Sequence, residues 1–118
     1  MGARDERDLA VLRKLKELGS ELSKPHMVDF FLYFPSEKQA KSAVSEIERE
    51  GYVVRVDPVS PPWWRRFFSK PVWACCASKS MVPERETILE TSAWFDVIAK
   101  RFCGEYDGWG SEVLSTDT

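Results

Sequence analysis

The chain has 118 residues, a length typical of a single domain. Seventeen basic residues against nineteen acidic ones give a net charge of −2, so general binding to polyanions is not expected. The charged N-terminus and the lack of a long apolar run indicate neither a secretory signal nor a membrane span, and we expect a cytoplasmic protein.

Leucines recur every three or four residues between positions 4 and 22, which predicts an amphipathic helix ending near Gly19. We expect this row to pack on its own domain. The row consists of Leu9, Leu12, Leu15, Leu18 and Leu22. The predicted organisation is a helical segment 1–24, a domain 25–114 and a tail 115–118.

The stretch 26–35 is the most regular strand pattern in the chain. Its even positions are all apolar, whereas its odd positions are mixed and aromatic. The even positions are Val28, Phe30, Leu32 and Phe34, and the odd positions are Met27, Asp29, Phe31 and Tyr33. Successive side chains on a strand point to opposite faces, so we expect one buried apolar face and one partly solvent-exposed aromatic face. Such a strand belongs in the middle of a sheet.

A helix is predicted after this strand. Ser36 is its N-cap, Gln39 completes a capping-box pattern, and Gly51 ends it. Residues 52–57 then form a short β-branched strand that we expect Pro58 to stop.

The connection that follows contains the chain's one basic and aromatic cluster. It consists of Trp63, Trp64, Arg65, Arg66 and Lys70, with Phe67 and Phe68 between them. With its arginines and aromatic residues, this loop, 63–70, could bind single-stranded nucleic acid or an acidic partner. Alternatively, its aromatic residues cover the sheet edge while the arginines stay in solvent, and we favour this structural interpretation.

Residues 71–79 are apolar on both faces and predict a second central strand. Cys75 and Cys76 are adjacent and would face opposite sides, so we expect reduced thiols and neither a metal clip nor a disulfide framework. A helix follows, with Pro83 in its first turn and Gly104 as its stop.

With a final strand over 105–113, the order after the first helix is β-α-β-β-α-β. This order predicts an α+β, ferredoxin-like sandwich: a four-stranded antiparallel sheet with two helices on one face, preceded by the N-terminal amphipathic helix. This topology places 26–35 and 71–79 in the middle of the sheet, in agreement with their apolar character.

No catalytic or cofactor chemistry is indicated. His26 is the single histidine, no Cys-x-x-Cys or acidic cluster has metal spacing, and no glycine-rich turn precedes a helix. RNA binding through the sheet is disfavoured, because the third strand has only Trp73 as an aromatic and Asp29 and Asp107 would lie near that face. We expect a non-enzyme without a cofactor; a small-molecule sensor would need a pocket that the aromatic core fills.

The run Glu-Tyr-Asp-Gly-Trp-Gly at 105–110 resembles the signature of the family of regulator of ribonuclease E activity B (RraB). The leucine helix, the Phe/Tyr-rich first strand, Gly51-Tyr-Val-Val54 and the cysteine-containing third strand fit the same family. The resemblance implies a ferredoxin-like protein that binds the endoribonuclease RNase E and lowers its activity, without catalysis or a cofactor. The alternative is a nucleic-acid-binding domain that uses the loop 63–70.

Two interpretations of the motif stay open. Its glycines could let a partner approach closely, or the final strand could be bulged so that its Tyr and Trp close the core. We expect the acidic C-terminal strand, with Asp29 beside it in the sheet, to face a protein partner. The predicted partner-binding residues are Asp29, Glu105, Tyr106, Asp107, Trp109 and Glu112.

Overall fold

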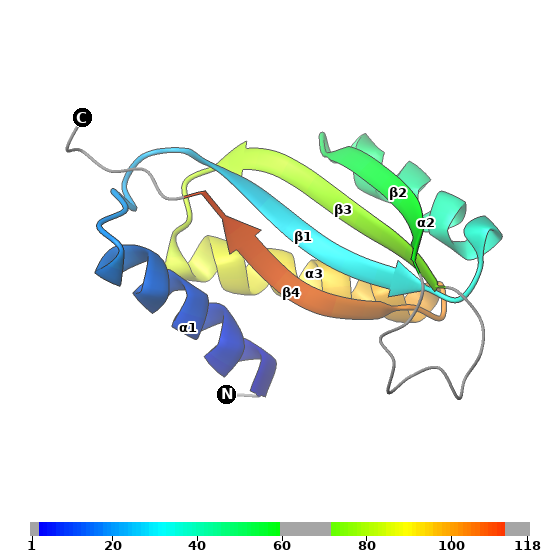
Figure 1. The fold of residues 1–118 in the computed structure, drawn as a ribbon, viewed down its shortest axis with the longest axis horizontal. Helices are drawn as coiled ribbons and strands as arrows, with labels where there is room; N and C mark the ends of the chain where they lie inside the picture. Colours follow the sequence, from blue (N-terminus) through cyan, green and yellow to red (C-terminus); the bar gives the residue numbers. More distant parts are fainter. Residues whose placement is uncertain (1–2, 60–71, 113–118) are drawn as a thin grey trace.

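The computed structural model describes residues 3–59 and 72–112 of the chain. The elements in chain order are α1 (Ala3–Glu17), β1 (His26–Phe34), α2 (Glu37–Arg49), β2 (Val53–Val59), β3 (Val72–Met81), α3 (Arg85–Arg101) and β4 (Glu105–Ser111). None of the described helices is long and apolar enough to cross a membrane. The predicted α+β class is confirmed (Figure 1).

The four strands form one sheet in the order β2-β3-β1-β4, and every neighbouring pair is antiparallel. β1 and β3 therefore occupy the middle, as their apolar sequences predicted and as the ferredoxin-like arrangement requires. β1 pairs with β3 along its whole length, from His26 opposite Met81 to Phe34 opposite Trp73.

The helices α2 and α3 lie behind the sheet in Figure 1 and cover one of its faces. The even positions of β1 are buried there, and Phe30 stacks on Phe95 of α3 with ring centroids 4.6 Å apart. Arg101 of α3 forms a 2.6 Å ion pair with Glu46 of α2. The two helices thus form one layer over a core that is aromatic at its centre.

The N-terminal helix packs on its own chain, as predicted, since α1 lies along β4 and α3 (Figure 1). Leu15 is buried in the same core as the sheet, but Leu18 lies beyond the end of the helix and is 54% exposed. The helix is therefore shorter than expected, but Leu12 and Leu22 of the predicted row also pack against this core. The division at residue 24 stays a prediction, although α1 and the sheet share one core.

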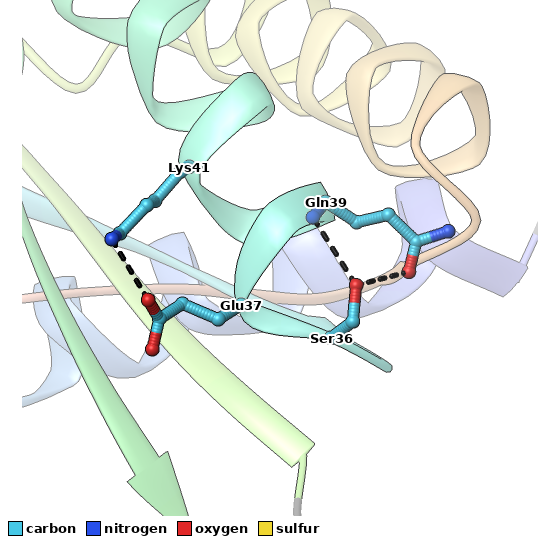
Figure 2. Close-up of polar contacts among 4 residues, drawn as sticks. All are labelled: Ser36, Glu37, Gln39 and Lys41. Carbon is cyan, nitrogen blue, oxygen red and sulfur yellow. Dashed lines mark hydrogen bonds and ion pairs between the residues drawn. The ribbon is translucent and has the colours of Figure 1, made fainter.

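The N-terminus of α2 has the predicted cap, drawn in Figure 2. The Gln39 backbone N–H donates to the Ser36 hydroxyl oxygen at 3.2 Å, and that hydroxyl donates to Gln39 Oε1 at 2.8 Å. Lys41 and Glu37 add an exposed ion pair of 2.8 Å one turn apart. Gly51 follows the helix with φ +90°, the left-handed conformation that ends helices.

Several element ends differ from the sequence predictions. β2 continues through Pro58 to Val59, because an edge strand can carry a residue without an N–H. Pro83 precedes the N-cap Glu84 instead of lying in the first turn of α3. The left-handed residue after α3 is Cys103, with φ +62°, and not Gly104.

Gly104 has a different role, which is steric. A Cβ at this position would lie 2.5 Å from the Tyr33 carbonyl oxygen and 2.5 Å from Cδ1 of Phe34. Only glycine lets the chain turn from α3 into β4 this close to β1.

Candidate functional site

A bulge in β4 decides which motif side chains point inward. Phe31 of β1 pairs with Gly108, but the next residue, Leu32, pairs with Tyr106, so Asp107 is the extra residue. Gly108 has φ +119°, a conformation that residues with a Cβ rarely adopt. Because of this insertion, Tyr106 and Trp109 face the helices although they are three positions apart.

Tyr106 and Trp109 are consequently core residues. They are 7% and 6% exposed. The Tyr106 hydroxyl is 2.7 Å from the hydroxyl of Ser92 on α3, and its ring stacks on Phe95 at a centroid distance of 6.0 Å. The interpretation in which the motif's Tyr and Trp close the core fits this geometry. Little of either side chain is left for a partner to touch.

The four acidic residues predicted to face a partner lie along β4 and beside it. Glu105 and Asp107 are exposed, and Glu112 is exposed just after the strand. Glu112 accepts a hydrogen bond from the Met27 backbone N–H at 3.2 Å. Asp29 is half-buried on β1 opposite Gly110 and accepts a hydrogen bond from the Ser78 hydroxyl. Asp29 and Glu112 thus lie near one end of β4, and Glu105 at the other.

The face of the sheet that α2 and α3 leave uncovered is turned towards the viewer in Figure 1. The strand registers place on it Met27, Asp29, Phe31 and Tyr33 of β1, Ala74, Cys76, Ser78 and Ser80 of β3, Val53, Arg55 and Asp57 of β2, and Glu105, Gly108 and Gly110 of β4. We call this surface the open face. Its large apolar side chains are well exposed: Met27 by 47%, Phe31 by 36% and Val53 by 70%.

The sequence prediction of the site omitted these apolar residues. The sequence did contain a signal for these residues, since the odd positions of the first strand predicted a partly solvent-exposed aromatic face. Sequence alone could not show that no described helix covers that face. Asp57 and Arg55 were also missed, because their position depends on the pairing of β2 with β3.

The charge of the open face is acidic. Its registers place Asp29, Asp57 and Glu105 on it against Arg55, the one cation among the described strand positions of this face. Asp107 is exposed at the bulge beside it. An acidic surface with aromatic residues suits a cationic partner better than a phosphate backbone.

The thiols show no paired or metal-binding arrangement. Cys75, Cys76 and Cys103 are free, and Cys75 and Cys76 face opposite sides of β3 as predicted. Burial raises the pKa of the Cys75 thiol to about 11, with a smaller contribution from Cys76. Within residues 3–59 and 72–112, no three His, Cys, Asp or Glu side chains gather as a set of metal ligands.

His26, the single histidine, is a buried structural residue. Its Nε2 is 2.6 Å from the Ser20 hydroxyl and its Nδ1 is 2.7 Å from the Lys24 carbonyl oxygen. Both ring nitrogens therefore have partners that hold the turn before β1. The predicted nucleic-acid patch, Trp63, Trp64, Arg65, Arg66 and Lys70, lies outside the described residues.

The sequence was also compared with known proteins. No curated protein matches the chain. Residues 5–111 match the family described as "Regulator of ribonuclease activity B", RraB. This match spans all seven elements apart from the first residues of α1, and it includes the bulged β4 strand. The chain therefore belongs to the RraB family.

Proposed function

We propose that this protein is a non-catalytic regulator that binds RNase E, or a related endoribonuclease, in the cytoplasm and lowers its cleavage of RNA. The family match over residues 5–111 is the observation that carries this proposal. It names regulation of ribonuclease activity as the role of the family.

The acidic residues Asp29, Glu105, Asp107 and Glu112 form the side of the molecule that we propose meets the partner. Ribonucleases bind RNA through basic surfaces, so carboxylates are suited to reach the same kind of surface. Tyr106 and Trp109 would contribute indirectly: they pack in the core on the helix-covered face and so hold β4 in position, without contacting the partner.

Titration calorimetry of this protein against RNase E of the same organism tests the proposal, together with cleavage of a labelled RNA. We expect binding in the micromolar range or tighter and slower cleavage as the protein is added. Binding without an effect on cleavage would contradict inhibition, and the absence of binding at high concentration would contradict the choice of partner.

Charge reversals then locate the contact. Asp107→Lys and Glu112→Lys should weaken binding, whereas Glu48→Lys, a change at an exposed position of α2, should not. Retention on single-stranded RNA that falls steeply with salt would instead favour the nucleic-acid-binding alternative.

A further inference from the structure

Phe31 stands at the centre of the open face, among neighbours that do not cover it. Its partner on β4 is Gly108 and its partner on β3 is Cys76. A Cβ on Gly110 would lie 3.6 Å from Phe31 Cε2, so the edge of the ring lies beside this second glycine. Both glycines of the β4 motif thus leave the ring uncovered on the side of the sheet edge.

The surroundings of Phe31 combine apolar area with negative charge. The open face of β1 carries Met27, Asp29, Phe31 and Tyr33, so three of its four side chains are apolar or aromatic. Met27 is 47% exposed and Tyr33 is half-buried. Asp29 lies between Met27 and Phe31, and Glu105 is opposite Tyr33. An aromatic residue ringed by polar groups is the usual make-up of a binding hot spot.

We infer that the open face is a docking surface for a cationic polypeptide segment with apolar side chains, anchored on Phe31. The inference rests on the proposed function, since the segment would belong to the regulated ribonuclease. Lysine or arginine side chains of the segment would pair with Asp29, Asp57 and Glu105, and its apolar side chains would cover Phe31 and Met27.

Charge decides between the possible occupants. RNA would bring its phosphates against three carboxylates and one guanidinium, which is repulsive overall. A second copy of this chain would bring the same excess of carboxylates against itself. A basic segment neutralises the face, and the exposed apolar side chains give it contact area that charge pairing alone does not provide.

Four variants test the surface in the binding assay with RNase E. Phe31→Ala should weaken binding about tenfold or more, the usual loss for a central interface aromatic. Phe31→Tyr should retain binding. Val97→Ala is the matched control, because Val97 is 54% exposed on α3, away from the open face. Asp57→Asn should weaken binding more at low salt than at high salt, since exposed charges are screened.

Equal affinity of Phe31→Ala and Val97→Ala would overturn the inference, provided that thermal unfolding shows both variants folded. If wild-type protein does not bind RNase E, the proposed function fails, and a second probe tests the face separately. A short peptide of alternating lysine and leucine should then shift the NMR amide signals of Phe31 and Tyr33, and the matched glutamate and leucine peptide should not. Equal shifts with both peptides, or shifts confined to the helices, would overturn the inference.

Discussion

Three glycines around β4 allow a quantitative test, because the structure gives each a different reason to be glycine. Replacing each with alanine adds one Cβ. At Gly104 this atom would lie 2.5 Å from a backbone carbonyl oxygen, which cannot rotate away. At Gly108 the space is empty, but φ is +119°. At Gly110 the added atom would make an ordinary contact of 3.6 Å with the Phe31 ring.

The expected losses of unfolding free energy follow this order. Gly104→Ala should cost about 3 kcal/mol, the upper end for overpacking. Gly108→Ala should cost about 1 to 2 kcal/mol, the penalty of a left-handed backbone for a residue with a Cβ. Gly110→Ala is the control and should change stability by no more than about 0.5 kcal/mol.

Urea unfolding followed by tryptophan fluorescence measures these differences. Small proteins lose about 1 to 3 kcal/mol per molar urea, so Gly104→Ala should lower the midpoint by about 1 to 3 M. The slope should be the same for all variants, which shows that the unfolded states are comparable. If Gly104→Ala and Gly110→Ala unfold at the same urea concentration, the packing of the α3-β4 turn against β1 is not as described.

Three further predictions concern the cap, the core and the thiols. Ser36→Ala should lower the unfolding free energy by about 1 kcal/mol in the same urea assay, since α2 loses its N-cap. Ser92→Ala and Tyr106→Phe should each cost about 1 to 2 kcal/mol by leaving a buried hydroxyl without this partner, and the double variant should cost less than their sum. At pH 8, iodoacetamide should label the exposed Cys103 long before Cys75, as followed by mass spectrometry, because the Cys75 pKa of about 11 keeps that thiol protonated. Equal labelling rates of the two thiols would contradict the burial of Cys75. Between about pH 9 and 11 the folded Cys75 thiol keeps a proton that the unfolded thiol has lost. The contribution of this thiol to the free energy of unfolding should therefore fall as the pH rises across that window.

The sheet could be predicted from the sequence because its signals are local. The alternation in β1 and the apolar run in β3 identified the two central strands, and the cap of α2 followed from Ser36 and Gln39. The burial of Ser92 on α3 could not be predicted in the same way: this polar side chain is fully buried, with its hydroxyl 2.7 Å from that of Tyr106. That contact depends on tertiary structure, which a helical periodicity does not contain.

The candidate site was only partly predictable. Acidic residues on the last strand could be named from the sequence, but a simple two-residue alternation would place Tyr106 and Trp109 on opposite faces. The register shift at Asp107 brings both to the core face. Likewise, the exposure of Phe31 follows from the small residues that pairing places opposite it, and pairing between distant strands is not written in local sequence.

The bulge has a consequence for how molecules of this protein meet in concentrated solution. β2 and β4 are the two outer strands, and an outer strand can recruit a strand of another molecule through its unused backbone groups. β4 is interrupted at Asp107, and β2 contains Pro58, which has no N–H to donate. Neither edge strand therefore presents an uninterrupted row of backbone hydrogen-bonding groups. We expect that strands of neighbouring molecules do not add to the sheet and that the protein does not form fibrils at high concentration.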